Sequence, residues 1–402
     1  DVYKRQLVDR VNVIISRTMV NPNIENVIIC RSMDQVVQFV NLNKKNIEKA
    51  FIIGGSSIYQ QFLDQNFVKT LYVSKISGQY HCDVFFPLIK GRFNLRTQQK
   101  NNGVVFAIYD YINKDEVLYL NLMKNILMHG EQRDDRTNTG TYSLFGNQLK
   151  FDLRDGRFPL MTTKFISFKN ICEELLWFVS GTTDVSLLQE KGIKIWDGNS
   201  SKDFLEGRGL KYEEGDIGPG YGHQWRHYNA EYKTCKDFYN GFGVDQLKNV
   251  IKMIKENPKS RRILVNAWNP CQLDDMALPP CHIMFQFYIS GKDMDEISCH
   301  MYQRSADTFL GLAYNIASYS LLTYMIGHIT EKKPKELIIS IGDTHVYKNH
   351  KDQVMLQAKR KTYPFPKLKI TRDIKDIDDF KRSDFKVINY TFHPSIKANM
   401  AI

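Results

Sequence analysis

A cysteine flanked by two prolines and a histidine is the feature of the sequence most able to do chemistry. Pro279 and Pro280 precede Cys281, and His282 begins an apolar, aromatic run that ends near residue 289. Proline fixes a backbone torsion and donates no hydrogen bond, so we expect a stiff loop that leads the thiol into a buried strand. A thiolate is a nucleophile, whereas a thiol in apolar surroundings is inert. This stretch alone leaves both interpretations open.

A carboxylate on an apolar helix face is the second candidate. The segment 168–181 has helical spacing, with Leu175 and Phe178 on the same face as Glu174, while Glu173 points elsewhere. Burial raises the pKa of a carboxyl group, which suits a proton donor or relay near neutral pH. A buried salt bridge is the structural alternative.

Polar side chains also gather where predicted elements begin and end. They comprise Gln303, Arg304, Ser305 and Asp307 at the end of a strand, Asn315 at the start of an apolar helix, and His345 with Tyr347 two residues further on. Residues two apart on a strand share a face, so the last pair is expected side by side. Arg261 and Arg262 precede another strand, and neighbours on a strand face opposite ways. They can therefore meet one anion only where the backbone is irregular, and are otherwise a solvated pair.

Three more candidates lie in predicted loops. Tyr221 lies in a flexible, glycine-rich loop over 216–228, and Arg136 leads a Thr/Gly-rich turn that could equally be solvated. Trp196 lies beside polar loop residues, where its ring could stack on a heterocycle or fill the core.

The first part of the chain alternates strands and helices. The predicted elements are a strand over 11–17, a helix over 31–40, and a strand then a helix within 50–63. Gly54 and Gly55 follow the last strand, and Ser56 or Ser57 opens the helix. A helix N-terminus behind glycines can cradle a phosphate, although a tight turn without a ligand explains the same pattern.

The sequence divides into two domains, which we place at 1–112 and 117–402, joined by a short polar junction over 113–116. The second domain opens with a helix over 116–130 that ends at Gly130 and has Leu118, Leu122 and Ile126 on one face.

Composition narrows the class of protein. The 402 residues carry a formal charge of +11, which predicts an anionic partner: nucleic acid, a membrane surface, or small phosphorylated and polycarboxylate ligands. Seven cysteines without paired spacing argue against a zinc site and a disulfide framework, and favour a reducing, cytoplasmic setting. No run approaches about 18 apolar residues, so we expect no membrane span. The chain lacks an initiator methionine and a signal-peptide pattern, and we expect it to be incomplete at its start.

Residues 1–112 resemble the C-terminal part of dihydrofolate reductase in Ser16-Arg17 after a strand and in FIIGGSSIYQQFL, LYVSKI and CDVFFPLI. The resemblance places Ser16, Arg17 and the stretch Gly54, Gly55, Ser56 and Ser57 at the phosphates of NADPH. It also implies that the first strands of that fold are missing, with the catalytic carboxylate. Val84 replaces the usual threonine that bonds this carboxylate. We therefore expect a partial α/β domain with a vestigial NADPH site and no reductase activity.

Residues 115–402 resemble thymidylate synthase along their whole length. The matching motifs are DRTNTGT, FPLMTTK, EELLWFVSG, IWDGN, GYGHQWRH, SRRILVNAWNP, MALPPCH, YQRSADTFLG, NIASY, GDTHVYKNH and HPSIKANMAI. The resemblance implies an α+β fold, a mixed sheet packed with helices, in a dimer-forming domain. With the segment ahead of it, the chain resembles the family of bifunctional dihydrofolate reductase–thymidylate synthases of protists and plants.

The resemblance assigns roles around dUMP. Cys281 would attack carbon 6 of the uracil ring. The phosphate would be bound by Arg136, Arg304 and Ser305, with Arg261 and Arg262 reaching in from the partner subunit of a homodimer. The uracil edge would face Gln303 and Asn315, whose amide offers one donor and one acceptor. His345 and Tyr347 would hold the 3′-hydroxyl of the sugar.

It assigns others around methylenetetrahydrofolate, the expected donor of carbon and hydride. The folate pocket would comprise Trp196, Asp307, Leu310, Gly311, Tyr314 and the C-terminal Met400, Ala401 and Ile402. Glu174 would relay protons, and Tyr221 would help to remove the proton from carbon 5. Phe165 replaces a usual basic residue and Tyr314 a usual phenylalanine, changes that we expect to be tolerated. These ligands account for the basic charge without nucleic acid, membrane or metal.

Three alternatives are weighed against this. A cysteine hydrolase needs a histidine near the thiol in space with an orienting partner, which the adjacency of Cys281 and His282 does not supply. A deoxycytidylate hydroxymethylase-like enzyme would have an aspartate in place of Asn315. A non-catalytic nucleic-acid-binding protein would gather its charge on one face.

Overall fold

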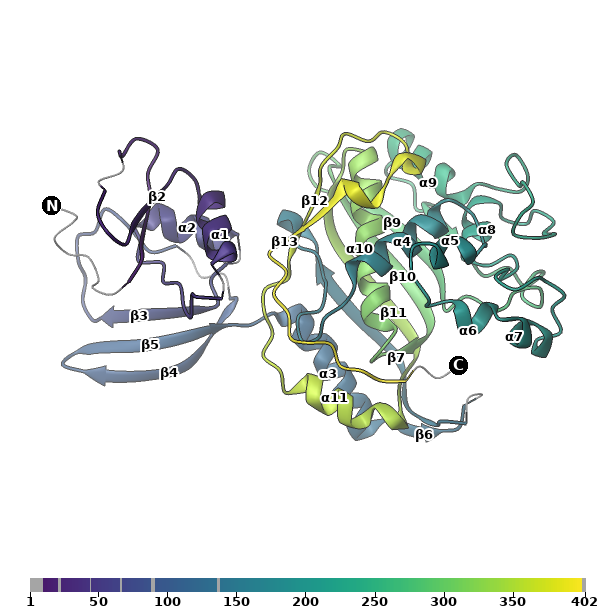
Figure 1. The fold of residues 1–402 in the computed structure, drawn as a ribbon, viewed down its shortest axis with the longest axis horizontal. Coiled ribbons are helices and arrows are strands. Elements are labelled where there is room, and N and C mark those ends of the chain that lie inside the picture. The colour runs from purple at the N-terminus through teal and green to yellow at the C-terminus, as the bar shows by residue number, and fades with distance from the viewer. Residues whose placement is uncertain are drawn as a thin grey trace. The chain divides into compact units, whose positions relative to one another are not determined.

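The chain forms two compact units, Asp1–Tyr109 and Asp110–Ile402 (Figure 1). The computed structural model describes residues 10–20, 23–43, 45–65, 67–87, 91–135 and 138–399. Each unit is taken by itself below.

Two small sheets and two helices make up the described part of the first unit. The elements are β1 Asn12–Ile15, β2 Val27–Cys30, α1 Met33–Leu42, α2 Ser56–Asp64, β3 Thr70–Ile76, β4 Phe93–Asn101 and β5 Val104–Tyr111. Strands β1 and β2 pair in parallel, and the other three form a sheet in the order β3-β5-β4. Ser32 caps α1 by accepting the N–H of Gln35. A small core forms around Cys30, Val36 and Phe62.

The strand predicted ahead of α2 is wrong. Residues 51–55 have no strand assignment, and the side chains of Phe51 and Ile53 are exposed. A strand needs a neighbour for its N–H and C=O groups, and no described strand pairs with this segment. The apolar run is therefore extended chain, followed by the expected helix.

A six-stranded mixed sheet organises the second unit. Its strands are β6 Glu131–Arg133, β7 Thr141–Asp152, β8 Leu264–Asn266, β9 His282–Ser290, β10 Glu296–Asp307 and β11 Lys333–Tyr347, in the order β6-β7-β11-β10-β9-β8. Only β10 and β11 pair in parallel within this sheet; its other pairs are antiparallel. A separate antiparallel pair consists of β12 Lys367–Ile370 and β13 Phe385–Ile388. The mixed sheet with packed helices confirms the predicted α+β architecture.

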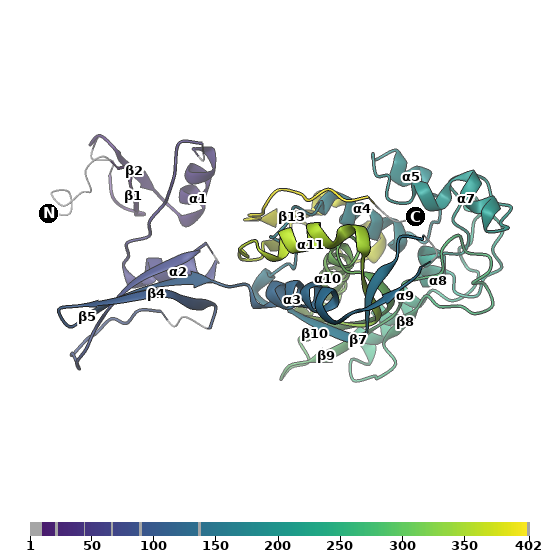
Figure 2. The same ribbon diagram turned by 90° about the horizontal axis from the view of Figure 1, so that it is seen from below.

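Helices cover one face of this sheet (Figure 2). The helices are α3 Lys114–His129, α4 Phe168–Val179, α5 Ser186–Gln189, α6 Asp197–Ser200, α7 Lys202–Gly207, α8 Tyr221–Arg226, α9 Gln246–Glu256, α10 Leu312–Ile329 and α11 Lys351–Ala358. Helices α10 and α3 lie directly on the sheet, α4 packs on α10, and α11 packs on α3. The uncovered face of β9 exposes Met284 and Tyr288.

Helix α10 is apolar on all sides because it lies in the centre of this layer, and nearly all of its residues are buried. Across the described residues, no helix combines the length and the apolar character that crossing a membrane requires.

The buried face of α3 differs from the prediction. Asn113 caps this helix, and Gly130 ends it as predicted. Leu118, which was predicted on the buried face, is 51% exposed. Glu116 and Tyr119 turn inward instead, because buried partners elsewhere in the chain bond their polar atoms. A buried polar group needs such a partner, and the partner here sets the face.

Candidate active site

The thiol of Cys281 stands at the end of the loop that precedes β9. The backbone N–H of Cys281 donates to the hydroxyl oxygen of Tyr221 at 2.7 Å, and its carbonyl accepts the N–H of Arg304 at 2.8 Å. The pairing of β9 with β10 brings the arginine to this position. Two residues 23 or more positions away in sequence therefore fix the backbone of the cysteine.

Arg304 places a cation beside the sulfur. Its Nε donates to the carbonyl of Pro280 at 2.8 Å and its Nη2 to that of Pro279 at 2.9 Å. The same Nη2 lies 3.9 Å from Cys281 Sγ, and the guanidinium is 5.6 Å from the ring centre of Trp268. A held cation favours the thiolate over the thiol. The prolines thus serve also as acceptors that aim the guanidinium.

Tyr221 is the first residue of α8, which corrects its predicted place on a flexible loop. Its side chain is 3% exposed, and its ring stacks on that of His282 with centres 4.1 Å apart. Burial raises the pKa of Tyr221 well above 10, so the hydroxyl stays protonated at neutral pH. Burial also lowers the pKa of His282 to about 3, and this neutral ring places Nδ1 2.8 Å from the hydroxyl of Tyr319.

The carboxyl group of Glu174 in α4 has a pKa near neutrality. Burial raises the pKa of Glu174 from 4.5 to about 7, an effect partly offset by a hydrogen bond from Trp196 Nε1 at 2.9 Å. Glu173 is also buried, rather than directed to solvent, and pairs with Lys191 at 2.7 Å and Arg382 at 3.3 Å. The salt-bridge alternative therefore applies to Glu173 rather than to Glu174.

Trp196 belongs to an aromatic wall around this carboxylate. Its ring is 7% exposed, with its centre 5.8 Å from that of Trp177 and 6.1 Å from that of Tyr221. The wall joins the residue that bonds Glu174 to the tyrosine beside Cys281.

Gln303 and Asn315 form a coupled amide pair. Gln303 Nε2 donates to Asn315 Oδ1 at 3.1 Å and to the carbonyl of Ser305 at 3.0 Å. Gln303 is 3% exposed, and its Oε1 has no partner among the described residues. A buried acceptor without a donor is costly, so a ligand N–H fits this position. The pair thus offers an acceptor and the asparagine N–H₂ donor to a planar ring.

The parallel pairing of β10 with β11 joins two other predicted groups. Asp307 lies opposite His345 in the register, and Asp307 Oδ1 accepts the N–H groups of Phe309 and Leu310 at 3.0 and 3.1 Å. His345 Nδ1 is 2.8 Å from Asp343 Oδ1, and its ring centre is 5.3 Å from that of Tyr347. The ends of the two strands therefore unite the predicted sugar and folate residues.

The loop from β10 to α10 contains Leu310 and Gly311 and leads to Tyr314. A cavity of about 520 Å³ lies beside it, lined by Leu310, Asn349, Gln353 and residues 396–399. Burial raises the pKa of Tyr314, whose hydroxyl therefore stays protonated. The cavity has the size and the mixed lining of a small-molecule site.

Some predicted residues are not brought to the thiol. Arg261 and Arg262 are exposed in irregular backbone before the edge strand β8, and no described contact links them to Cys281. Arg136, Met400, Ala401 and Ile402 lie outside the described residues.

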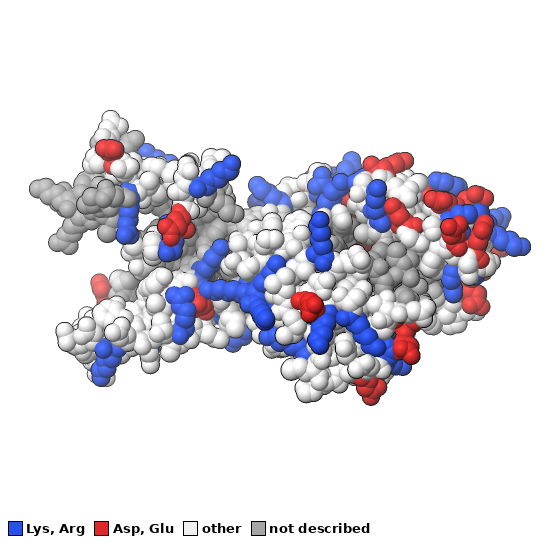
Figure 3. Space-filling view, turned by 60° about the horizontal axis from the view of Figure 1, so that its bottom comes forward, with Lys and Arg blue, Asp and Glu red and all other residues white. Residues whose placement is uncertain are grey.

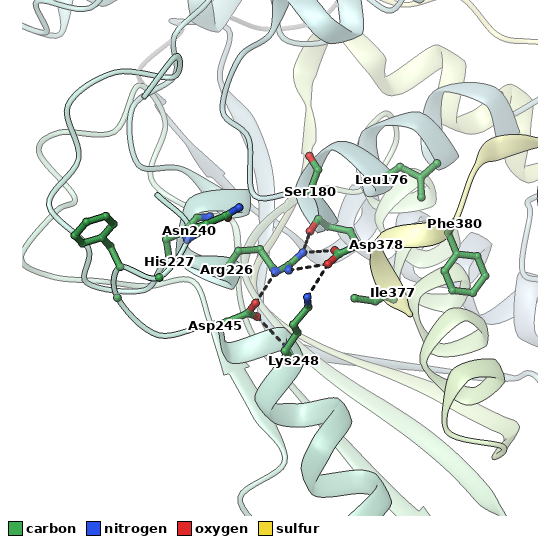
Figure 4. A pocket seen from close by; sticks show the side chains of 14 residues that line it. Leu176, Ser180, Arg226, His227, Asn240, Asp245, Lys248, Ile377, Asp378 and Phe380 are labelled. Atoms are coloured by element: carbon green, nitrogen blue, oxygen red, sulfur yellow. Dashed lines mark hydrogen bonds and ion pairs between the residues drawn. The ribbon is translucent and has the colours of Figure 1, made fainter. Parts of the chain in front are cut away.

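A larger cavity, of about 590 Å³, lies where α8, α9 and the segment 377–380 meet (Figure 4). Arg226 lies between Asp245 at 3.0 Å and Asp378 at 2.6 Å, and Lys248 reaches Asp378 at 2.9 Å. Two cations and two anions neutralise each other here. The charges of the cavity fasten the segment 377–380 to α8 and α9.

The residues predicted to cradle a phosphate in the first unit lie at the start of α2. Gly54 and Gly55 are joined by a cis peptide bond and directly precede α2, whose first N–H groups no side chain caps. A Cβ on Gly55 would meet no atom within 4 Å, so space is open beside the helix N-terminus. Ser56 Oγ donates to the carbonyl of Phe85 at 2.9 Å, which leaves Ser57 as the hydroxyl for a ligand. These groups fit a phosphate.

Ser16 and Arg17 follow β1 in the same unit. Ser16 Oγ accepts the N–H of Met19 at 3.0 Å, and Arg17 is exposed. An exposed guanidinium can meet a second phosphate without a desolvation cost.

Sequence reasoning missed several residues of the site. His282 was weighed only as a base, whereas its neutral ring supports Tyr221. Lys164 is buried, with its ammonium bonded to the carbonyl of Phe309 and 3.9 Å from that ring centre. Burial lowers the pKa of Lys164 to about 8. Both residues lie in motifs quoted above, His282 in MALPPCH and Lys164 in FPLMTTK. Their roles were missed because the residues that they contact are distant in sequence.

Comparison with known proteins assigns the chain to two enzyme classes. The thymidylate synthase family model matches residues 117–402, and the dihydrofolate reductase family model matches residues 1–111. The chain is 41% identical over 451 residues to a bifunctional dihydrofolate reductase-thymidylate synthase of Zea mays, covering 100% of this chain and 86% of the relative. It is 42% identical over 444 residues to a similarly named protein of Arabidopsis thaliana, covering 99% of this chain and 78% of the relative. The thymidylate synthase of Saccharomyces cerevisiae is 53% identical over 298 residues, covering 72% of this chain and 98% of that protein.

The chain belongs to the family of bifunctional dihydrofolate reductase–thymidylate synthases. The predicted fold class and enzyme classes, a methyltransferase and a reductase, are confirmed. Methylenetetrahydrofolate and NADPH are the ligands of these two families, as predicted. The reductase match spans residues 1–111, and a truncation of that domain stays a prediction.

Surface charge agrees with this class rather than with a nucleic-acid-binding protein. Toward the right of Figure 3, acidic side chains lie among the basic ones. Several lysines of the second unit are paired, as in Lys150 with Glu336 at 2.6 Å and Lys335 with Glu296 at 2.7 Å. Paired lysines contribute little to the binding of a polyanion.

Proposed function

We propose that the second unit converts dUMP to dTMP, with methylenetetrahydrofolate as donor of the carbon and the hydride. The observation that carries the proposal is the position of Arg304, held by two proline carbonyls with Nη2 3.9 Å from Cys281 Sγ. The cation favours the thiolate, which forms a C–S bond to carbon 6 of the uracil ring. The ring electrons then move to carbon 5, which attacks the donated carbon as one of its two bonds to folate nitrogen breaks. Loss of the proton from carbon 5 expels the second nitrogen, and hydride transfer from the folate then gives the methyl group and dihydrofolate while the C–S bond breaks and releases the thiolate.

Proton transfer in this scheme falls to Tyr221 and Glu174. The hydroxyl of Tyr221 accepts the backbone N–H of Cys281 and stays protonated, so it polarises a water or ring atom rather than acting as a phenolate. Glu174, with its pKa at about 7, can both give and take a proton near neutral pH. Glu174 thus relays protons, and Tyr221 helps to remove the proton from carbon 5.

Recognition of the base falls to the amide pair. The unpartnered Oε1 of Gln303 accepts from the ring N–H, and the amide of Asn315 faces the neighbouring carbonyl. Uracil presents an N–H and a carbonyl in this order, whereas cytosine presents an acceptor and an amino group. The pair therefore supports dUMP over deoxycytidylate.

The remaining contacts follow the strand ends. The phosphate is assigned to Arg304, Ser305 and Arg136, and the 3′-hydroxyl to His345 and Tyr347. The folate is assigned to the cavity beside Leu310, together with Trp196, Asp307, Gly311, Tyr314, Met400, Ala401 and Ile402. The cavity lining and the pairing of Asp307 with His345 support this division.

We also propose a homodimer in which the uncovered sheet face is the interface. Met284 and Tyr288 are exposed on that face, and Arg261 and Arg262 directly precede its edge strand β8. Each arginine pair would then reach the phosphate in the partner's site. Mixing Cys281→Ala with the double variant Arg261→Ala, Arg262→Ala tests this, because subunit exchange rebuilds one complete site. Restored activity is expected, and two variants that stay inactive on mixing would contradict it.

For the first unit we propose binding of the NADPH phosphates by Ser16, Arg17 and the stretch from Gly54 to Ser57. The open space at Gly55 and the uncapped start of α2 support it. Val84 is exposed and supplies no hydroxyl, so we expect no reduction of dihydrofolate by these 402 residues. Loss of absorbance at 340 nm with NADPH and dihydrofolate would contradict this.

The synthase proposal is tested by incubating the protein with dUMP and methylenetetrahydrofolate. Formation of dihydrofolate and dTMP in equal amounts is expected. Replacing dUMP by deoxycytidylate should give no product, and a product from deoxycytidylate alone would favour the hydroxymethylase alternative.

A further inference from the structure

Phe165 packs against the C-terminal segment although it is 41% exposed. Its ring centre lies 4.9 Å from that of Phe392 and 6.3 Å from that of Tyr390, and the latter two are 4.6 Å apart. Three rings from two distant parts of the chain thus form one cluster. Such pairs contribute through packing and ring electrostatics rather than through charge.

The loop that presents Phe165 is held rigidly from its inner side. The fully buried carboxylate of Glu116 accepts four hydrogen bonds of 2.6 to 2.8 Å from the backbone and hydroxyls of Thr162 and Thr163. The hydroxyl of Tyr390 donates to the carbonyl of Met161 and accepts the N–H of Ile166, which closes both ends of the loop. Phe165 is therefore presented from a fixed base.

The C-terminal segment runs from this cluster to the proposed folate cavity. Beyond Phe392, the N–H of His393 donates to the carbonyl of Thr162 at 2.8 Å, and Arg360 bonds the carbonyl of Pro394 at 2.7 Å. Residues 396–399 then line the cavity with Leu310. The carbonyl of Asn399 lies 2.7 Å from His350 Nε2. The position of residues 390–399 consequently decides the shape of the cavity.

The residue at 165 is a departure from the basic side chain usual in this family. A basic residue would hold its neighbours through charge, whereas Phe165 holds Phe392 and Tyr390 through apolar contact. Packing of this kind is hardly screened by salt. With phenylalanine at position 165, the segment 390–399 is therefore held by apolar contact instead of by charge.

We propose that Phe165 is a positioning residue for the folate co-substrate: with Tyr390 and Phe392 it seats residues 390–399 over the cavity beside Leu310. The inference rests on the proposed function for the identity of the ligand. It predicts that the cluster affects the binding of methylenetetrahydrofolate and leaves that of dUMP unchanged.

The test compares Phe165→Ala with Phe165→Tyr and with the control Phe238→Ala, an exposed phenylalanine outside the site. Phe165→Ala should raise the KM for methylenetetrahydrofolate about twofold to tenfold, the range that loss of an aromatic pair corresponds to. The KM for dUMP and kcat should stay within about twofold, and Phe165→Tyr should restore the wild-type value, because the ring is kept. An unchanged folate KM, or equal rises for both substrates, would overturn the proposal.

A second readout does not depend on activity. Lys397 is exposed in the segment, and trypsin should cleave after it faster in Phe165→Ala than in the wild type or in Phe238→Ala. Equal cleavage rates in all three proteins would overturn the proposal even if the enzyme were active. Failure of the proposed function would show itself differently, as absence of dTMP from the wild type, with the difference in cleavage intact.

Discussion

The backbone N–H of Cys281 donates to the hydroxyl oxygen of Tyr221 at 2.7 Å, so the hydroxyl proposed to act at carbon 5 is held at the backbone that carries the thiol. One bond links a strand start to a helix start, and the stacked ring of His282 supports the tyrosine from behind. This bond sets the position of the hydroxyl relative to the backbone of the proposed nucleophile.

Tyr221→Phe removes this acceptor and leaves the ring stack intact. Because a positioned acid or base contributes about 100-fold or more, we expect kcat to fall by about that factor. The melting temperature should fall only modestly, because the N–H of Cys281 loses its acceptor while the ring still packs on His282. Steady-state kinetics and thermal unfolding check this prediction. A kcat within about threefold of wild type would refute a role of Tyr221 in catalysis.

Glu174→Gln should abolish the proton relay and remove one titration from the pH profile. Burial raises the pKa of Glu174 from 4.5 to about 7, so wild-type kcat should show an inflection near pH 7 that the variant lacks. A profile of the same shape in both proteins would contradict this assignment.

The same shift has a consequence for stability, with a defined sign. A raised carboxyl pKa means that the folded state retains its proton longer than the unfolded state does. The contribution of Glu174 is complete below pH 4.5 and is lost as the pH rises through about 7. Glu174→Gln does not titrate, so its melting temperature relative to wild type should rise between pH 5 and pH 8.

The ion pairs of the larger cavity predict that the folded protein loses stability in acid, which is opposite to the effect of Glu174. Burial alone would raise the pKa of Asp378, but hydrogen bonds from Arg226 and Lys248 outweigh it and lower the pKa below 3.8. The contribution of Asp378 is present above pH 3.8 and is lost as the pH falls below it. Acid should therefore loosen the segment that Figure 4 shows fastened to α8 and α9.

Asp378→Asn should destabilise the protein by about 1 kcal/mol at pH 7, a modest value because the carboxylate is 39% exposed. Urea unfolding at pH 7 and at a pH about one unit below 3.8 measures the change, which should shrink at the lower pH because the contribution of Asp378 is lost only below pH 3.8. Asp373→Asn, at a side chain 75% exposed, is the matched control and should have no measurable effect. An equal loss in both variants would exclude the proposed role of the Arg226 pair.

Local patterns in the sequence predicted the parts of the site that lie within one element. The prolines before Cys281 and the alternation after it indicate a stiff loop and then a strand, and β9 begins at His282 as expected. Helical spacing likewise indicated α4 and its buried face with Ile171, Leu175 and Phe178. In both cases the deciding interactions lie within a few residues.

The features that depend on distant partners were not predictable in this way. Glu173 is buried because Lys191 and Arg382 come to it from other elements, and neither is visible in the spacing of α4. Tyr221 opens a helix although glycines around it favour a loop, because its buried ring packs on His282. The parallel register of β10 and β11 that joins Asp307 to His345 is equally a property of the fold.

The central claim, that the thiolate of Cys281 bonds carbon 6 of dUMP, is tested most directly with dUMP carrying tritium at carbon 5. With methylenetetrahydrofolate, the wild type should release tritium to water at the rate at which dihydrofolate absorbance appears. Cys281→Ala should fold with an unchanged circular dichroism spectrum and release none. Tritium release and dTMP formation that persist in Cys281→Ala would contradict the account.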